Sequence, residues 1–324
     1  MGAGRDLPWF DAAAIRAALR PRQAVDALAV AIHAGLDPAA GIPRSVVPMT
    51  HGELLVMAAE YDAVAGVKLA TVAPGNAGRG LPRIQGVFVL FDAETLAPVA
   101  LLDGIELTAL RTPAVSLLAA RDRLLASGDP LDIVVFGTGI QAVRHVEGAV
   151  DVVEGHRPVR SVTYLCRRPG QTSVPDAAGL RPRVLTADPD DVTGAAREAI
   201  TGAGLLVCAT TARRPLFDGR WVGDDAVVVA VGSHQPDARE VDDQLAARSC
   251  VVVEDVTTAR REAGDIVLAI ESGALDPDRL VSLTSAVRNP GLMPHGCPLL
   301  FKSTGMAWQD VVVARAVSRA VVRS

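Results

Sequence analysis

The segment from residue 132 to residue 142 constrains the fold of this chain more than any other. An apolar run, 132–136, is followed by Gly137-Thr138-Gly139-Ile140-Gln141-Ala142, a GxGxxA pattern that leads into a helical stretch. The first glycine of such a pattern permits a tight turn, the second lets the backbone approach a ligand, and the alanine lets the helix pack on the strand. The helix start attracts phosphate. The pattern predicts a dinucleotide-binding turn, with an ordinary glycine-rich connection as the alternative.

Strands and helices alternate around this turn. Further apolar strands are expected at 161–166, 183–185, 205–209, 226–231 and 250–254, with helical stretches between most of them. Such alternation is typical of a parallel sheet with both faces covered. Residues 121–305 are therefore predicted to form a doubly wound parallel-sheet (Rossmann) domain in an α/β protein.

The first third of the chain has a different pattern. Residues 15–36 and 107–125 are predicted to be helical, and Pro21 is a suitable helix start. Strands are expected at 45–47, 54–57, 65–69 and 86–91, separated by short turn sequences. Strands joined this closely predict an antiparallel or mixed sheet in an α+β domain. One more helix is expected at 306–322.

Composition excludes several classes of protein. Net charge is −5 with both signs mixed along the chain, and only 3% of residues are aromatic, so a nucleic-acid partner is not expected. No apolar run approaches the roughly 18 residues that span a bilayer, and the amino terminus lacks the pattern of a signal peptide. The four cysteines form no CxxC pair and the six histidines no metal-ligand spacing. We expect a cytoplasmic protein without metal or membrane partner.

The end of the second Rossmann strand bears on the choice of cofactor. An aspartate or glutamate at this corner would read the ribose of NAD, but the strand is followed by Arg167 and Arg168. An arginine can pair with a 2′-phosphate and stack on adenine. The corner favours NADP, with NAD possible if these arginines are only solvated turn residues.

Three cations in the first third suggest a binding site for a carboxylate. Lys68 lies inside an apolar strand, where an ammonium group is costly unless it is paired or neutralised. Arg111 lies on a helix rich in alanine, and Arg44 lies at the start of a strand. Each could be an ordinary surface charge, but together they would suit capture of a small carboxylate-bearing molecule.

Several short motifs in the chain carry a family resemblance. They are Lys68, Asn76, Gly80-Leu81-Pro82, Gly86, Leu90-Phe91-Asp92, Leu110-Arg111-Thr112, Gly137–Ala142, Gly232-Ser233, Pro236-Asp237-Ala238-Arg239-Glu240 and Phe301-Lys302-Ser303-Thr304-Gly305-Met306-Ala307. In this order they resemble the ornithine cyclodeaminase/mu-crystallin family over nearly the whole chain.

The resemblance implies a domain plan and a set of roles. Residues 1–120 with 306–324 would form a substrate-binding and dimerisation domain around the inserted domain 121–305, and the protein would be a homodimer. The active site would lie between the domains. Arg44, Lys68 and Arg111 match residues that bind the substrate carboxylate. Cofactor contacts match Thr112, Gly137, Thr138, Gly139, Ile140, Gln141, Ala142, Arg167, Arg168, Thr210, Val231 and Ser303.

One position departs from the cyclodeaminases of this family. They carry a catalytic aspartate where this chain has His234, two residues before Pro236. A histidine can be cationic and would repel the side-chain amine that the aspartate attracts. This weakens a cyclodeaminase assignment and leaves hydride transfer intact. His234 is a candidate catalytic residue, or a loop histidine with no role.

Three functions follow from these observations. The first is an NADPH-dependent reductase of a small carboxylate-bearing imine, or the reverse amino-acid oxidation, with Lys68 and Arg111 as catalytic residues. The second is a cyclodeaminase-type ammonia lyase that uses bound NAD. The third is a binding protein of mu-crystallin type that holds NADP and a small ligand.

Overall fold

The structure is a computed structural model that describes residues 7–187 and 194–323. Two compact units make up the chain: unit 1 is Met1–Arg111 with Met306–Ser324, and unit 2 is Thr112–Gly305. The chain passes from unit 1 to unit 2 within helix α3 (Gly104–Leu125). Residues 1–6, on which the expectation about a signal peptide depends, lie outside the described residues.

Unit 1 is built on a six-stranded mixed sheet with the order β1-β6-β5-β4-β3-β2. All neighbours are antiparallel except β1 and β6, which are parallel. Its elements are β1 (Trp9–Phe10), α1 (Ala12–Ala18), α2 (Pro21–His33), η1 (Pro38–Ala40), β2 (Ser45–Met49), β3 (Gly52–Tyr61), β4 (Val64–Val72), η2 (Pro74–Arg79), β5 (Ile84–Asp92), β6 (Pro98–Asp103), the first part of α3, and α10 (Ala307–Arg323).

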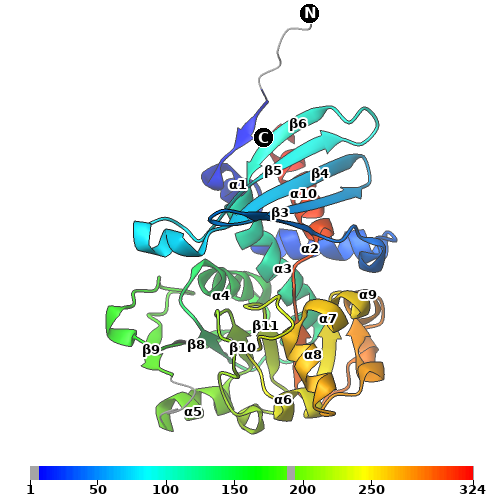
Figure 1. Cartoon of the computed structure of the whole chain (residues 1–324). Helices are drawn as coiled ribbons and strands as arrows, with labels where there is room; N and C mark the ends of the chain where they lie inside the picture. Colours follow the sequence, from blue (N-terminus) through cyan, green and yellow to red (C-terminus); the bar gives the residue numbers. More distant parts are fainter. Residues whose placement is uncertain (1–6, 188–193, 324) are drawn as a thin grey trace, which may run out of the picture. The chain divides into compact units, whose positions relative to one another are not determined.

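Helix α10, from the last part of the sequence, packs with the first third of the chain in unit 1. It packs on β3, β4 and β5 and against α2 (Figure 1). Its buried side chains include Val311, Val313 and Val317. Because a sheet must bury its apolar face against another layer, the core of unit 1 is incomplete without this last helix.

Unit 2 is built on an eight-stranded sheet with the order β13-β12-β14-β11-β10-β7-β8-β9, in which every pair is parallel. Its strands are β7 (Leu131–Phe136), β8 (Val159–Cys166), β9 (Arg183–Thr186), β10 (Leu205–Cys208), β11 (Val227–Ala230), β12 (Cys250–Val253), β13 (Val281–Ser282) and β14 (Leu299–Lys302). Its helices are α4 (Ile140–Val153), α5 (Gly194–Gly202), α6 (Asp243–Arg248), α7 (Val256–Glu262), α8 (Gly264–Glu271) and α9 (Leu283–Arg288), with short turns η3 (Pro169–Gln171), η4 (Gly219–Trp221), η5 (Pro277–Arg279) and η6 (Pro290–Leu292).

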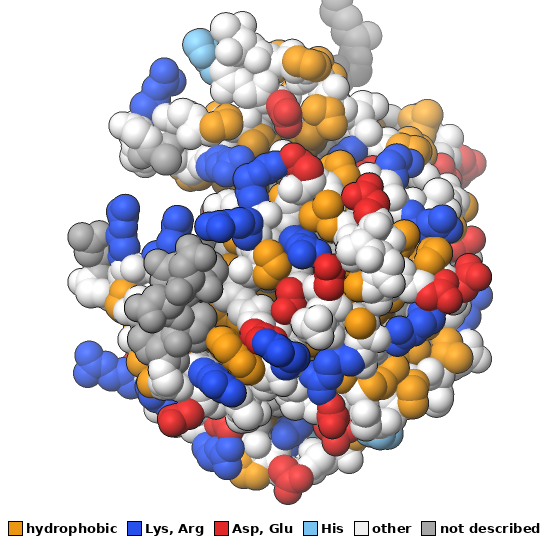
Figure 2. Space-filling view, turned by 60° about the horizontal axis from the view of Figure 1, so that its bottom comes forward, with side chains coloured by type: hydrophobic (Ala, Val, Ile, Leu, Met, Phe, Trp, Pro, Cys, Tyr) orange, Lys and Arg blue, Asp and Glu red, His pale blue; other side chains and the backbone are white. Residues whose placement is uncertain are grey.

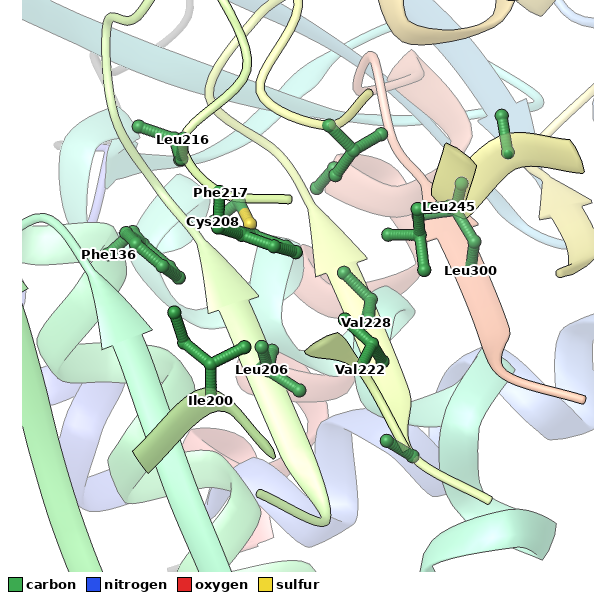
Figure 3. Close-up of a cluster of buried hydrophobic side chains, with 14 of the residues drawn as sticks. Phe136, Ile200, Leu206, Cys208, Leu216, Phe217, Val222, Val228, Leu245 and Leu300 are labelled. Atoms are coloured by element: carbon green, nitrogen blue, oxygen red, sulfur yellow. The ribbon is translucent and has the colours of Figure 1, made fainter. Parts of the chain in front are cut away.

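The core of unit 2 is aliphatic on the side covered by α5 and α6. Figure 3 shows side chains of β7, β10, β11 and β14 meeting Ile200 of α5 and Leu245 of α6. Phe136 and Phe217 add a stacked pair with ring centroids 5.0 Å apart. Strands β10, β11 and β14 are buried along their whole length, as expected of a parallel sheet with both faces covered.

The predicted fold class is confirmed, and four strands are additional to it. The sequence did not indicate β1 or β13, which have two residues each, β6, which begins with a proline, or β14, a four-residue strand after Pro298 that ends in a charged residue. β14 is last in the sequence but lies between β11 and β12 in the sheet. That position depends on pairing with strands that are distant in the sequence, so the local sequence does not predict it.

The described surface carries both charge signs. On the face drawn in Figure 2, Lys and Arg side chains are interspersed with Asp and Glu and with hydrophobic side chains. No helix among the described residues is long and apolar enough to cross a membrane.

Candidate active site

Lys68 is placed by the alternation of strand β4. Gly66, Lys68 and Ala70 share one face of the strand, and all three are buried. A Cβ on Gly66 would lie 2.2 Å from Cζ of Phe88, so the ring of Phe88 fills the space beside Lys68. Residues on the other side of the strand do not share this burial. The sheet therefore directs the Lys68 ammonium into the interior of unit 1.

Asp310 of helix α10 is the partner of Lys68. Nζ of Lys68 lies 3.0 Å from Oδ1 and 2.8 Å from Oδ2 of Asp310, and 3.3 Å from Oγ1 of Thr108 on α3. Asp310 has no exposed surface. Three elements that are distant in the sequence meet at this ammonium group, so its position is fixed by the tertiary fold of unit 1.

Arg111 shares the same carboxylate. Its Nε donates to Oδ1 of Asp310 at 3.2 Å, and its Nη1 donates to Oε1 of Gln309 at 2.8 Å. Arg111 is also buried. Lys68 and Arg111, predicted as substrate-binding residues, are thus held side by side by one aspartate. Two cations share one anion, which leaves an excess of positive charge for an anionic ligand.

The electrostatics of this cluster favour proton transfer near neutral pH. Burial lowers the pKa of Lys68 to about 8, and the positive charges of Arg111 and Arg44 lower it as well, against the opposing effect of Asp310. Arg44, half-buried just before β2, is therefore close enough for its charge to act on Lys68. The three predicted carboxylate-binding cations all belong to unit 1.

The GxGxxA turn of unit 2 has the geometry that a diphosphate needs. Gly137 has φ +97°, and a Cβ there would lie 2.5 Å from the carbonyl oxygen of Ala209. A Cβ on Gly139 would meet no heavy atom within 4 Å, so the space in front of it is open. Gly139 is the N-cap of α4, and no side chain caps that end. The buried Ala142 lets α4 approach the sheet. The turn fits a dinucleotide.

This turn lies where the order of the strands reverses. β7 has β8 on one side and β10 on the other, and ligands of such sheets bind at this switch point. Arg167 and Arg168 are exposed after β8. On the other half, Thr210, Val231 and Ser303 follow β10, β11 and β14. These predicted cofactor contacts therefore lie along one edge of the parallel sheet, whereas Thr112 lies on α3.

Two carboxylates hold the loops at that edge. Glu240 accepts hydrogen bonds from Thr210 N (2.8 Å), Thr210 Oγ1 (2.7 Å) and Gly232 N (2.7 Å). Glu254 accepts from Ser303 Oγ (2.8 Å), Thr304 N (2.9 Å) and Gly305 N (2.9 Å). Both glutamates are buried. The two glutamates thus hold the backbone and the hydroxyl groups of these loops in place without a ligand.

A buried histidine connects the start of α4 to helix α3. Nδ1 of His145 lies 2.7 Å from the carbonyl oxygen of Gln141, and Nε2 lies 3.0 Å from Oγ of Ser116. Burial lowers the pKa of His145 to about 4, so the ring is neutral at neutral pH and Nδ1 must carry the proton that it donates to the carbonyl. His145 thus ties the predicted phosphate turn to the segment of α3 that carries the buried Thr112.

The remaining candidate, His234, is exposed on the loop after β11. It belongs to unit 2, whereas Lys68 and Arg111 belong to unit 1. Its catalytic role stays a prediction.

Sequence reasoning missed several residues of these sites. Asp310, Gln309 and Glu254 were not selected, and Glu240 and Lys302 were named only within family motifs, because no local rule predicts the partners of these side chains. One signal was available: of 32 basic residues only Lys68 and Lys302 are lysines, and both are buried. Arginine serves everywhere else, so each lysine marks a position where a compact ammonium group is required.

Comparisons with known proteins agree with the fold described above. The model of the ornithine cyclodeaminase/mu-crystallin family matches residues 14–324. The chain is 33% identical over 327 residues to Delta(1)-pyrroline-2-carboxylate reductase 2 of Burkholderia ambifaria, covering 97% of this chain and 96% of that protein. It is 32% identical over 280 residues to ketimine reductase mu-crystallin of Rattus norvegicus, covering 85% and 83%. The structure of Thermococcus litoralis Delta(1)-pyrroline-2-carboxylate reductase in complex with NADH and L-proline has a TM-score of 0.83 at 24% identity, covering 98% of each chain.

Proposed function

Because the chain belongs to the ornithine cyclodeaminase/mu-crystallin family, we propose that it is an NAD(P)-dependent reductase of a small imine that carries a carboxylate. Relatives named as pyrroline-2-carboxylate and ketimine reductases support this reaction. The observation that carries the proposal is the buried Lys68–Asp310–Arg111 cluster of unit 1. It offers a carboxylate two cations at one point, and one of them, Lys68, is also a proton donor with a lowered pKa.

The residues of unit 1 bind and protonate the substrate. Arg111 and Arg44 bind the carboxylate and so orient the C=N group. Protonated Lys68 donates a proton to the imine nitrogen, and Asp310 holds the ammonium in place for this transfer. A reduced nicotinamide, when bound, would supply the hydride that the imine carbon needs. Carbon and nitrogen each gain one hydrogen, and the product is a secondary amine with its carboxylate intact.

An absorbance assay tests the reaction. Purified protein with NADPH is mixed with a cyclic imino acid such as Δ1-pyrroline-2-carboxylate, and loss of nicotinamide absorbance is followed. We expect NADPH oxidation in proportion to amine formed and no release of ammonia. Ammonia release from ornithine without net change in absorbance would instead support a cyclodeaminase. Cofactor binding without turnover of any imine would support a binding protein.

The pH dependence of the reaction is expected to follow Lys68. A proton donor with a pKa of about 8 is charged below that pH and neutral above it. For imine reduction, kcat/KM should be level below pH 8 and fall about tenfold per pH unit above it. Oxidation of the amine needs neutral Lys68, so its rate should rise through the same range. A reductive rate that stays level to pH 10 would contradict this role.

The two lysines make this titration directly observable. NMR of protein labelled at lysine Cε should give one resonance for Lys68 and one for Lys302, because the sequence has no other lysine. The resonance that titrates near pH 8 is expected to vanish in Lys68→Met. Persistence of that titration in the variant would assign it elsewhere.

We propose that the preferred cofactor is NADP. The exposed Arg167 and Arg168 follow β8 directly, and no carboxylate lies among residues 166–170. The double variant Arg167→Ala/Arg168→Ala should weaken NADPH binding by about ten- to a hundredfold and leave NADH binding unchanged, because only NADPH carries a 2′-phosphate. Calorimetry with both nucleotides measures this. Arg183→Ala, at the beginning of β9, is the control for a lost exposed arginine, and an equal loss in it would contradict the assignment.

We also propose that the protein is a homodimer that pairs through unit 1. β2 is the edge strand of the mixed sheet, and Val46, Val47 and Met49 on it are 41–51% exposed. An apolar edge strand is ready to pair with another strand. The mass of the protein in solution, from light scattering, tests this proposal.

A further inference from the structure

A connected set of buried charges lies behind the loops that follow β10 and β11. It consists of Glu240, Asp265 at the start of α8, and Lys302 at the end of β14. Glu240 and Asp265 are linked because Glu240 N donates to Oδ1 of Asp265 at 2.6 Å. Asp265 pairs in turn with Nζ of Lys302 at 2.8 Å. None of the three has more than 1% of its surface exposed.

Glu240 and Lys302 both form hydrogen bonds with the backbone of loops at the same edge of the sheet. Glu240 accepts from Thr210 after β10 and from Gly232 after β11. Nζ of Lys302 donates to the carbonyl oxygen of Ser233 at 2.7 Å. The loop after β11 is thus fastened at two consecutive residues, once through an N–H group and once through a carbonyl.

The two loops also touch each other directly. A Cβ on Gly232 would lie 2.0 Å from the carbonyl oxygen of Thr210 and 2.5 Å from Oε1 of Glu240. The carboxylate of Glu240 therefore lies beside the point where the two backbones come into contact. Both oxygens of its carboxylate are used, one for each loop.

These loops lie on one side of the predicted diphosphate turn. The dinucleotide of a doubly wound sheet spreads from the switch point over both halves of the sheet. With the adenosine half over β8, beside Arg167 and Arg168, the other half falls over β10 and β11. Thr210 and Val231 are at or next to residues that Glu240 holds.

We propose that Glu240 is a positioning residue that fixes the loops after β10 and β11 against each other and thereby shapes the surface that receives the nicotinamide half of the dinucleotide. This inference rests on the proposed function. Glu240 has no exposed surface, so it acts through Thr210 and Gly232.

The test substitution is Glu240→Gln. It keeps the shape of the side chain, but the amide NH₂ then faces the N–H of one loop, so one of the two attachments is lost. We expect binding of NADPH to weaken by about tenfold or more, as for a lost hydrogen bond to a charged group. Binding of 2′-phosphoadenosine diphosphoribose, which lacks the nicotinamide ring, should change less than about twofold. Calorimetry with both ligands gives the comparison.

Asp242→Asn is the matched control. Asp242 also accepts one backbone N–H on each oxygen, from Leu245 at 2.9 Å and Gly219 at 3.0 Å, and neither partner is a predicted cofactor contact. It should lose thermal stability without changing the ratio of the two affinities. If Glu240→Gln does not fold, Glu240→Asp, which is too short to reach both loops, serves the same comparison.

The outcomes separate the inference from the proposed function. Selective loss of NADPH affinity in the Glu240 variant supports the inference. Unchanged NADPH binding, or equal loss of both ligands, overturns it while the proposed function stands. Failure of the unsubstituted protein to bind either ligand overturns the proposed function and the inference with it.

Discussion

Replacing Lys68 by methionine is expected to reduce kcat/KM for imine reduction by at least about a thousandfold. Methionine has similar length and no charge, so the variant loses both the proton donor and one of the cations that bind the carboxylate. The remaining ion pair, Arg111 with Asp310, keeps the buried carboxylate partnered. Steady-state kinetics with saturating NADPH measure the loss.

Nucleotide binding is the control for this variant. The predicted diphosphate turn is in unit 2 and Lys68 is in unit 1, so the affinity for NADPH should be unchanged. Lys68→Arg separates the two roles of the lysine. It keeps a cation but donates no proton near neutrality, because an arginine side chain stays charged. It should bind a carboxylate inhibitor and still turn over slowly. Normal turnover in either variant would refute the mechanism.

Asp310→Asn is expected to lower the free energy of unfolding by about 3–5 kcal/mol, because it leaves two buried cations without their shared anion. Nζ of Lys68 and Nε of Arg111 both bond to this carboxylate, and Asp310 has no exposed surface. Urea denaturation followed by circular dichroism measures the change. The variant should also move the break of the pH profile to lower pH, since the charge of Asp310 raises the pKa of Lys68.

Asp62→Asn is the matched control for this substitution. Asp62 also pairs with arginines of helix α10, Arg315 and Arg319, but its side chain is 51% exposed. An exposed pair contributes at most about 1 kcal/mol, so the control should unfold nearly as the unsubstituted protein does and keep its pH profile. Equal destabilisation in both variants would show that burial of the aspartate does not determine how much free energy of unfolding is lost.

Much of the fold could be predicted because short sequence patterns, such as apolar runs and turn residues, indicate its elements. The GxGxxA turn joins β7 to α4 over a few residues, and each strand of the parallel sheet except the two last in sequence is an apolar run that local reading finds. Pro21 begins α2 as predicted, because proline suits the first turn of a helix. The position of β14 within the sheet could not be predicted, since it depends on pairing with β11 and β12.

The candidate site was only half accessible to sequence reasoning. Lys68 stands out as a charge in an apolar strand, which is a local signal. Asp310 lies 242 residues further along the chain, in a helix otherwise rich in valine, and no local rule joins the two. The same holds for Glu240 and Lys302, which are linked through Asp265. Cations could be selected by type, whereas their counter-ions required the tertiary structure.

The place of helix α10 has a consequence for biosynthesis. On the ribosome, residues 112–305 emerge as one uninterrupted stretch and can fold as soon as they are clear of the exit tunnel. The sheet of unit 1 is translated first, but the surface of β3, β4 and β5 on which α10 packs stays without that helix until residues 307–323 have been made. Asp310 arrives in that last helix, so the nascent chain carries Lys68 and Arg111 without their counter-ion for most of its synthesis. A chaperone that shields this sheet would act on the earlier-made half of the molecule.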